Sequence, residues 1–377
     1  MDIASLNNYL DTKLTLSRLE ILLVELPQKE VFRSSIGIRT SRKAIIIKWI
    51  DQQGHEGYGE CSCRPDPFYS HEFVNGAIEV IRDYLFPQIK GITSYGELLK
   101  SLEIVRGWDF TKSAIEFAAN DMLRRKSGVG LIEAAQAEQI DNIPVGISLG
   151  LFDNAEKLQE KVDSLEGEEY QRLKFKISQD YHNKEILRSF SQLSHPNISF
   201  DANGAFNERG FDLLQKFAEL DKIIEQPFPP GHFYLYQEYL KSNKSFKVCL
   251  DEEVSTYGHL INYGLIMDEL NIKPGRVGGL WKTLKLINYC QEHGIPVWVG
   301  GMFETSIGRA LNLQVASLLP KAKAHDLSPS NRYFKRDLVE NPIMMTKGFI
   351  NKDKFDSIII DQKAITEMTM SKLDLVV

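Results

Sequence analysis

Apolar residues follow two different rhythms along this chain. In the first part, runs rich in aliphatic residues at 19–24 and 44–50 are typical of β-strands, and a third strand could begin at 58–60. From residue 70 to about 125 the apolar positions recur every three or four residues, which predicts helices. Strands followed by helices predict a small α+β domain.

Beyond residue 142 the rhythm changes, and short apolar runs recur, each followed by a helical stretch. Eight strands alternating with helices over roughly 190 residues predict a parallel (β/α) barrel, although a doubly wound sheet would show a similar rhythm. The runs lie at 143–149, 173–177, 198–201, 223–225, 248–251, 270–273, 297–301 and 324–327.

These rhythms divide the chain into four segments. Residues 1–16 are predicted to be a polar leader, residues 17–135 the α+β domain, and residues 136–335 the barrel. Residues 336–377 follow the barrel and contain one strand-like run at 357–360, which could return to the first domain.

Composition narrows the class of protein. Of the 377 residues, 43% are hydrophobic and 25% are charged, which is average for globular proteins and excludes disordered, collagen-like and coiled-coil chains. The net charge of −6 offers no basic surface for nucleic acid or an anionic membrane. The four cysteines form no disulfide framework, and no signal peptide or membrane span is evident. We therefore expect a cytoplasmic enzyme of small metabolites.

Charged side chains stand at the ends of five successive predicted strands. Successive charges are 22 to 26 residues apart, about one βα unit, so they should meet at the rim where the chemistry of parallel barrels gathers. Alternation along a strand also places Lys174 and Lys176 on one face, and likewise Asp201 and Asn203. In chain order the strands end on Lys174 and Lys176, Asp201 and Asn203, Glu225, Asp251, and Lys273.

Three carboxylates between two groups of lysines indicate proton abstraction assisted by a metal. Buried charges must be paired or hold a metal, and Asp201, Glu225 and Asp251 offer the oxygen ligands that Mg²⁺ prefers. A lysine near a divalent cation loses its proton more easily, so Lys176 and Lys273 could act on the α-proton of a metal-bound carboxylate. Solvated surface charges, a Schiff-base aldolase and a catalytically silent barrel are the alternatives.

Five further residues are candidates for contact with a substrate. Ser148 ends the first barrel strand and Asn203 shares the face of the strand-three aspartate, so either could bind substrate, as could Lys174. Met302 would line an apolar pocket, or pack at the top of the barrel without a function. Arg276 follows the strand-six lysine and could instead be a rim arginine paired with a loop carboxylate.

The strand-end motifs resemble those of the enolase superfamily, in its muconate-lactonizing subgroup, and the resemblance covers nearly the whole chain from about residue 19. It implies an α+β capping domain completed by the C-terminal segment, and a (β/α)7β barrel. It also implies Mg²⁺, with Mn²⁺ as a substitute, on the three carboxylates, Lys176 and Lys273 as the acid/base pair, a small carboxylate substrate, and a homo-oligomer. The motifs are Lys174-Phe175-Lys176, Asp201-Ala202-Asn203, Glu225-Gln226-Pro227, Leu250-Asp251-Glu252 and Asn271-Ile272-Lys273.

Longer runs narrow the resemblance to o-succinylbenzoate synthases, and to the branch of them that includes N-succinylamino acid racemases. The runs are 271–279 and 294–305 in the barrel, with 59–61, 66–70 and 32–37 in the capping domain. In this family the 32–37 segment is a loop that closes over the substrate. The synthase reaction implied is the syn dehydration of 2-succinyl-6-hydroxy-2,4-cyclohexadiene-1-carboxylate in menaquinone biosynthesis.

In that reaction Lys176 would take the α-proton and Lys273 would stabilise the enediolate as an ammonium. The racemase reaction uses both lysines, one on each face of the α-carbon, and Arg276 is the residue that this branch associates with racemisation. A dedicated racemase with little synthase activity is therefore the alternative function. Dipeptide epimerases share the barrel chemistry, but the run at 274–279 favours the first two.

Overall fold

The computed structural model describes residues 3–34, 37–179, 184–241, 246–264 and 266–377. The strands are β1 (Arg18–Ser34), β2 (Gly37–Ile50), β3 (Glu56–Cys61), β4 (Asn142–Pro144), β5 (Gly146–Leu149), β6 (Arg172–Lys176), β7 (Ile198–Asp201), β8 (Ile223–Glu225), β9 (Lys247–Leu250), β10 (Glu269–Ile272), β11 (Val297–Val299), β12 (Phe349–Asn351) and β13 (Thr369–Val376). The helices are α1 (Ile3–Tyr9), α2 (Val74–Val80), α3 (Phe86–Ile89), α4 (Tyr95–Leu102), α5 (Asp109–Ser127), α6 (Leu131–Ala134), α7 (Ala155–Asp163), α8 (Lys184–Gln192), α9 (Phe211–Ala218), α10 (Phe233–Lys241), α11 (Tyr257–Tyr263), α12 (Leu280–Glu292), α13 (Ser306–Ala316), α14 (Asp353–Asp356) and α15 (Gln362–Met368).

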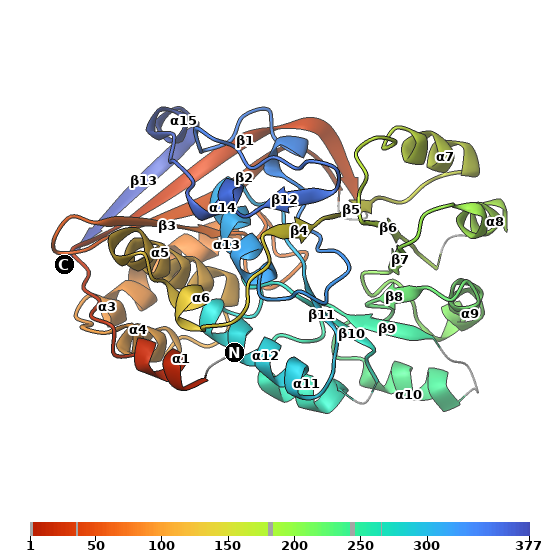
Figure 1. Cartoon of the computed structure of the whole chain (residues 1–377), viewed down its shortest axis with the longest axis horizontal. Helices are drawn as coiled ribbons and strands as arrows, with labels where there is room; N and C mark the ends of the chain where they lie inside the picture. The colour runs from red at the N-terminus through yellow and green to blue at the C-terminus, as the bar shows by residue number, and fades with distance from the viewer. Residues whose placement is uncertain (1–2, 35–36, 180–183, 242–245, 265) are drawn as a thin grey trace.

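One lobe is a four-stranded antiparallel sheet with helices against it, and it corresponds to the predicted capping domain. Its strands run in the order β13-β1-β2-β3, and Figure 1 shows the long strands β1 and β2 on the side of the molecule away from α8 and α9. Gly57 and Gly59 alternate along β3 because α5 lies directly against them, and a Cβ at Gly59 would collide with the Ala114 carbonyl. The middle of the predicted substrate-covering loop, at 35–36, lies outside the described residues.

The last strand of this sheet comes from the C-terminus, although not from the run predicted for it. The isoleucine-rich run at 357–360 is not a strand, because only Ile360 makes an isolated bridge, to Val339. Instead β13 pairs antiparallel with β1, with Arg18 opposite Val376. The expectation that the C-terminal segment completes the capping sheet is confirmed, but its strand-forming residues were wrongly identified.

The predicted polar leader packs into the capping lobe. Leu6 and Tyr9 on α1 are buried, as are Leu14 and Leu16 before β1. The Tyr9 ring meets the Tyr95 ring edge to face, with 5.0 Å between centroids. This segment therefore contributes apolar side chains to the core.

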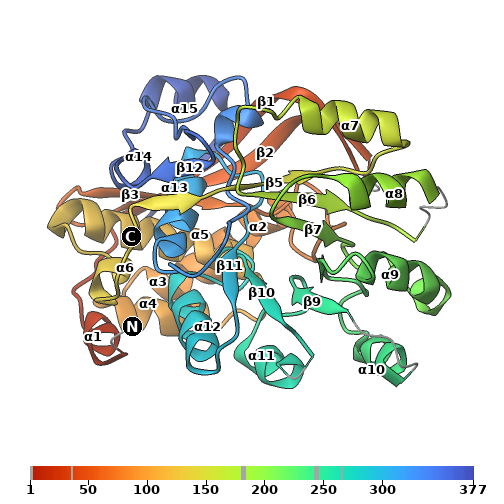
Figure 2. The same cartoon turned by 45° about the vertical axis from the view of Figure 1, so that its right-hand side comes forward.

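The other lobe is a parallel sheet whose strands follow chain order without a switch point. The seven strands run β11-β10-β9-β8-β7-β6-β5, and Figure 2 shows this sheet curling with helices outside it. The predicted eighth strand at 324–327 is reduced to two parallel bridges, from His325 to Val145 and from Asp326 to Gly300. Because these bridges reach the segments before β5 and after β11, they join the two edges of the sheet. The barrel is confirmed and the doubly wound sheet is wrong.

Alternation along the strands sends aromatic rings outward and charges inward. Phe175 on β6 and Phe200 on β7 both pack edge to face on Phe190 of α8, with centroids 5.1 Å apart in each pair. Their neighbours Lys174 and Asp201 therefore point to the opposite face, which is the interior of the barrel.

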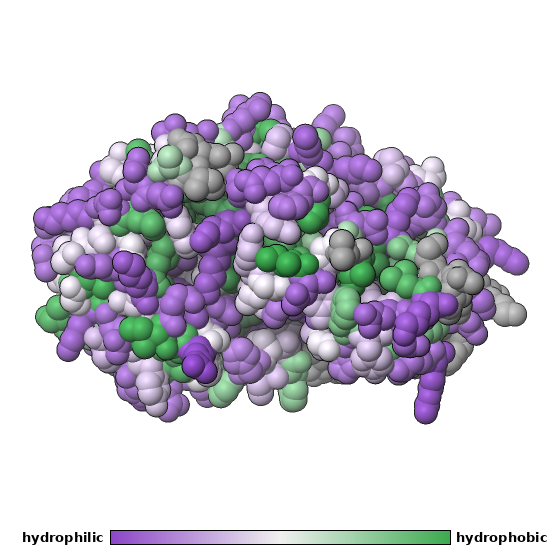
Figure 3. Space-filling view, turned by 90° about the horizontal axis from the view of Figure 1, so that it is seen from below, coloured by the Kyte–Doolittle hydropathy of each residue, from purple (hydrophilic) through white to green (hydrophobic). Residues whose placement is uncertain are grey.

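The exposed surface mixes polar and apolar side chains. The face in Figure 3 is mostly hydrophilic, with apolar residues in small separate patches. Within the described ranges, no helix combines the length and the apolar character that crossing a membrane requires.

A buried carboxylate joins the two lobes. Glu60 on β3 accepts hydrogen bonds from the Thr305 backbone N–H at 3.0 Å and the Thr305 hydroxyl at 2.7 Å, at the start of α13. Burial, and to a lesser extent the charge of nearby Glu304, raise the pKa of Glu60 to about 8, although Thr305 and Arg42 oppose the shift.

We expect the free energy of unfolding to record this titration. A carboxyl whose pKa rises from 4.5 in the unfolded chain to about 8 in the folded one stabilises the fold below pH 4.5 and loses that contribution as the pH rises through 8. Glu60→Gln cannot ionise, so it should gain stability relative to the wild type between pH 5 and pH 8.5. Urea unfolding of both proteins at pH 5 and pH 8.5 measures the difference in their free energies of unfolding. The same difference at the two pH values would contradict the prediction.

Candidate active site

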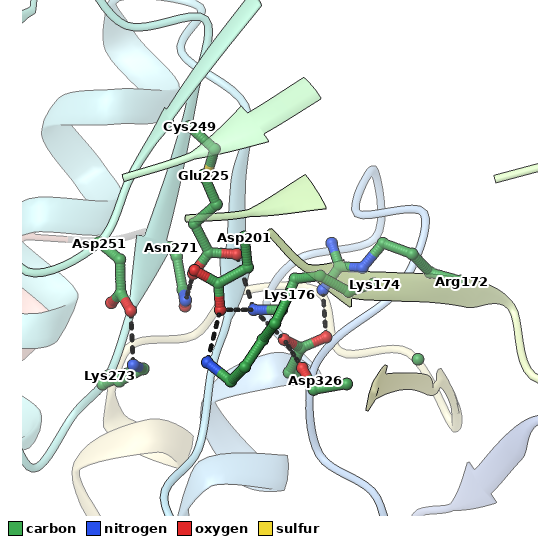
Figure 4. A network of polar contacts seen from close by, with 12 residues as sticks. Arg172, Lys174, Lys176, Asp201, Glu225, Cys249, Asp251, Asn271, Lys273 and Asp326 are labelled. Carbon is green, nitrogen blue, oxygen red and sulfur yellow. Dashed lines mark hydrogen bonds and ion pairs between the residues drawn. The ribbon is translucent and has the colours of Figure 1, made fainter. Parts of the chain in front are cut away.

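Strand register brings the predicted charges together at one end of the barrel. Lys176 lies opposite Asp201 across β6 and β7, and Asp201 lies opposite Glu225 across β7 and β8. Asp251 and Lys273 each follow the last residue of their strands, β9 and β10. Figure 4 shows Lys176 directed toward Asp201 and Lys273 directed toward Asp251. The structure therefore brings these five predicted residues to the same rim.

Glu225 is the central carboxylate in strand order and, like Asp251, has only 1% of its surface exposed. It accepts hydrogen bonds from Lys174 Nζ and from Asn271 Nδ2, each at 2.6 Å. Burial raises the pKa of Glu225 to about 8, with Lys174 opposing the shift and the neighbouring carboxylates of Asp201 and Asp251 adding to it. The neighbouring carboxyl groups therefore disfavour one another's ionisation, and a bound cation would relieve that repulsion.

Asp251 lies between two cations. Lys273 Nζ is 2.6 Å from Asp251 Oδ2, and Arg276 Nη1 contacts Asp251 Oδ1. Burial works against ionisation, but Arg276 and Lys273 outweigh it and hold the pKa of Asp251 below its usual range. Arg276 is buried and paired with a proposed metal ligand, and its contact with substrate stays a prediction.

Lys176 is the more accessible of the two predicted acid/base lysines, with 31% of its side chain exposed. Its Nζ lies 3.4 Å from Asp201 Oδ2 and also contacts Asn203 Oδ1. Asn203 has a left-handed backbone with φ of 44°, and its N–H donates to Asp201 Oδ1 at 3.0 Å. This turn brings the Asn203 side chain back beside Lys176, as the shared face predicted.

Lys273 is more enclosed, with 12% of its side chain exposed. Its Nζ lies 3.2 Å from the hydroxyl of Tyr69, a capping-domain residue whose role the sequence did not reveal. Burial lowers the pKa of Lys273, but the charge of Asp251 outweighs that effect and raises the pKa well above its ordinary value. This lysine is therefore held as an ammonium ion.

Asp326 is a member of the site that the sequence analysis missed. It accepts from Lys174 Nζ and from Arg172 Nη2, each at 2.5 Å, and from the Ser148 hydroxyl at 3.1 Å. The sequence did offer a signal for Asp326. It lies near the end of the predicted run at 324–327, and the other carboxylates of the site also lie at the ends of barrel strands.

The remaining predicted substrate contacts have different surroundings. Lys174 is 4% exposed, and three carboxylates lie within 3.7 Å of its Nζ. Ser148 is exposed and hydrogen-bonded to Asp326. Met302 is half-buried, and its N–H donates to Glu304 at 2.6 Å. Contact of these three residues with substrate stays a prediction.

The donor set fits a divalent cation in its chemistry. Asp201, Glu225 and Asp251 are all at most 4% exposed and offer only oxygen atoms. Glu252 follows Asp251 in the chain, and its Oε2 is buried without a hydrogen-bond partner within the described part of the molecule. A buried oxygen of this kind could be satisfied by a bound cation. As the side chains stand, the carboxylates face lysines and Arg276, and no three of the described His, Cys, Asp or Glu side chains already enclose a metal position.

Known proteins resemble this chain over most of its length. The family model "Enolase C-terminal domain-like" matches residues 155–354. An o-succinylbenzoate synthase from Bacillus subtilis is 33% identical over 352 residues, which is 91% of each chain. An N-succinylamino acid racemase from Amycolatopsis is 32% identical and covers 89% of this chain and 92% of its own. A crystal structure of an enolase superfamily member from Listeria innocua has a TM-score of 0.89 at 29% identity and covers 96% of this chain and 99% of its own.

Proposed function

Because the chain belongs to the enolase superfamily, we propose that it is an o-succinylbenzoate synthase. The observation that carries the proposal is the arrangement at the rim, where Lys176 and Lys273 flank three buried carboxylates from adjacent strands. The relatives named above as synthase and racemase support the same chemistry, which is removal of a proton next to a carboxylate.

We propose that Asp201, Glu225 and Asp251 hold a divalent metal, with Mg²⁺ as the expected ion and Mn²⁺ as a substitute. Members of the superfamily use a divalent metal, usually Mg²⁺. When bound, the metal supplies positive charge that stabilises the dianion formed from the substrate carboxylate. The burial of three carboxylates from adjacent strands supports this assignment, because a bound cation would relieve their mutual repulsion.

The two lysines then have separate roles in the dehydration. Lys176, which is the more exposed, takes the α-proton at Nζ as the C–H bond breaks. The electron pair moves into the carboxylate system, where the Lys273 ammonium donates to the developing charge. That electron pair then forms a C=C bond to the neighbouring carbon as the C–O bond there breaks. In a syn elimination the proton held by Lys176 lies on the side of the departing hydroxide and leaves with it as water.

Racemisation of N-succinylamino acids is the second candidate function. Lys176 and Lys273 reach the rim from β6 and β10, and the carboxylate-bearing strands β7, β8 and β9 lie between them in the sheet. Arg276 shares Asp251 with Lys273, which places a second cation beside one lysine but not beside the other. A dedicated racemase with little synthase activity would have the same site.

The initial rate of consumption of 2-succinyl-6-hydroxy-2,4-cyclohexadiene-1-carboxylate with Mg²⁺ tests the leading proposal. Efficient turnover that EDTA abolishes supports a synthase and makes racemisation a side activity. Negligible turnover by folded, metal-loaded protein refutes it and leaves racemisation as the function.

Asp326 gives a further prediction for either reaction. Lys174 Nζ lies between the carboxylates of Asp326 and Glu225. Asp326→Asn removes one of these two negative charges, so Lys174 should shift and no longer hold Glu225 in place. We expect kcat/KM to fall about 10- to 100-fold, as it does when the partners of metal ligands are replaced. Asp268→Asn, at the opposite end of β9 where it accepts from Val248, is the matched control. An unchanged kcat/KM for Asp326→Asn would exclude the role.

We further propose that the enzyme acts in the cytoplasm on a small carboxylate, as a homo-oligomer. The relatives named as o-succinylbenzoate synthase and N-succinylamino acid racemase support the substrate class. Light scattering on the purified chain tests the oligomeric state, and a monomer mass would refute it.

A further inference from the structure

The loop that carries Lys273 is lined by the capping domain. This loop, at 273–279, connects β10 to α12. A Cβ at Gly275 would lie 3.1 Å from both the Phe110 ring and the Ser62 hydroxyl, so the capping lobe approaches this backbone too closely for a larger residue. The loop is therefore shaped by contacts from outside the barrel.

Glu116 makes the most direct of these contacts. It lies on α5 with 1% of its surface exposed, and its Oε1 accepts from the Trp281 backbone N–H at 2.8 Å and from the Tyr95 hydroxyl at 2.8 Å. Trp281 is the second residue of α12. The carboxylate thus satisfies an N–H of the first helical turn, which has no partner within the helix itself.

The glycine pair before α12 makes room for this carboxylate. Gly279 has φ of 115°, and a Cβ there would collide with Glu116 Oε2. Gly278 has φ of 91°, and its Cβ would lie 2.7 Å from Asp109 Oδ1 at the start of α5. Both backbone conformations favour glycine, and both glycines face acidic groups of the capping domain. The Gly-Gly sequence is therefore explained by the docking of α5.

A salt bridge holds the same turn of α12 at a second point. Lys282 Nζ lies 2.8 Å from Glu103 Oε1 and 3.4 Å from Asp109 Oδ1, and both acids belong to the capping domain. Lys176, at the end of β6, takes part in none of these contacts among the described residues. The contacts therefore act on one of the two catalytic lysines.

We propose that Glu116 is a positioning residue for Lys273. By holding the first turn of α12 it fixes the loop at 273–279, and so the place of Lys273 Nζ beside the α-carbon of the substrate. This inference rests on the proposed function. It predicts that losing Glu116 impairs proton transfer on the face of the substrate that Lys273 reaches more than on the face that Lys176 reaches, where Lys273 only stabilises the developing charge.

Deuterium exchange at the α-carbon of each enantiomer of N-succinylphenylalanine, with Mg²⁺ in D₂O, tests this prediction. The enantiomer that Lys273→Ala fails to exchange identifies the Lys273 face. Glu116→Ala should slow exchange of that enantiomer about 10- to 100-fold, the effect of misplacing a catalytic group by about 1 Å, while exchange of the other enantiomer slows by a smaller factor. Glu116→Gln keeps one accepting oxygen and the side-chain length, so it should show a smaller decrease on the same face.

Asp361→Ala is the matched control, because Asp361 accepts from the Ala364 N–H at 2.8 Å at the start of α15, in the C-terminal segment. It should lower the melting temperature without changing the ratio of the two exchange rates. Dehydration gives an independent readout, in which Glu116→Ala lowers kcat and leaves KM within about twofold.

Equal slowing of both enantiomers, or an unchanged kcat for dehydration, would overturn the inference and leave the proposed function standing. If Glu116→Ala does not fold, an unchanged rate ratio and an unchanged kcat in Glu116→Gln would overturn it. A folded wild-type protein that neither dehydrates nor exchanges would refute the proposed function, and the inference with it.

Discussion

Lys176→Ala should abolish α-proton exchange from the enantiomer that Lys176 serves and reduce dehydration by about 100- to 10,000-fold, the usual contribution of a general base. Lys176 is the more exposed lysine, at 31%, and its Nζ contacts only the Asp201 and Asn203 side chains among the contacts described above. Removing it leaves Glu225 and Asp251 with their own cation partners. Folding and Mg²⁺ binding should therefore be preserved.

Circular dichroism, calorimetric titration with Mg²⁺ and steady-state kinetics on the same preparation check this result. Lys247→Ala is a suitable control, since Lys247 begins β9 at the opposite end of the barrel and pairs with exposed Asp221. Near wild-type dehydration in Lys176→Ala would refute the assignment of the base. Loss of Mg²⁺ binding together with activity would instead show that the ammonium stabilises the carboxylates.

The rim of the barrel could be predicted because its geometry is local. Side chains alternate along a strand, so Lys174 and Lys176 had to share a face, and successive parallel strands end at one edge. The spacing of one βα unit then sufficed to place Asp201 opposite Glu225, as the register of β7 and β8 does.

Contacts between distant parts of the chain could not be predicted in the same way. Tyr69 lies 204 positions before Lys273, which its hydroxyl contacts, and Glu116 meets Trp281 only after the two lobes dock. No periodicity within either segment encodes these distances. Asp326 differs from these, because the predicted run at 324–327 contained it, although its pairing with Arg172 and Lys174 appears only when the sheet closes.

The strand misidentified in the C-terminal segment shows how burial can mislead. Ile358 and Ile360 are buried while Ile359 is exposed, which is the alternation of a strand, yet this run packs without a continuous partner. In contrast, β13 is an edge strand in which four of eight residues are apolar, but none of its side chains is fully buried. Hydrophobic patterning detects buried faces and therefore missed this strand.

Glu225→Gln should weaken Mg²⁺ binding by more than about 100-fold and abolish both dehydration and racemisation. Replacing even the hydrogen-bond partner of a metal ligand lowers metal affinity or activity about 10- to 100-fold, and Glu225 is a proposed ligand itself. Glu225 is the central carboxylate, lying between Asp201 and Asp251 in strand order, and it is 1% exposed. Glutamine keeps the volume and can still accept from Asn271, so the barrel should stay folded. Lys174 also retains Asp326 as a partner at 2.5 Å, which avoids an unpaired buried charge.

Calorimetric titration with Mg²⁺ on folded protein, followed by turnover at saturating Mg²⁺, measures both effects. Glu253→Gln is the matched control, because Glu253 is also buried near the site but accepts from the Gly231 N–H at 3.0 Å. Wild-type affinity for Mg²⁺ in Glu225→Gln would remove Glu225 from the metal site.

Mg²⁺ binding should also release a proton from Glu225. Burial raises the pKa of this carboxyl to about 8, so Mg²⁺ should displace its proton in the wild type. Mg²⁺ binding at pH 7 should accordingly release protons to the buffer, and Glu225→Gln should lose that release.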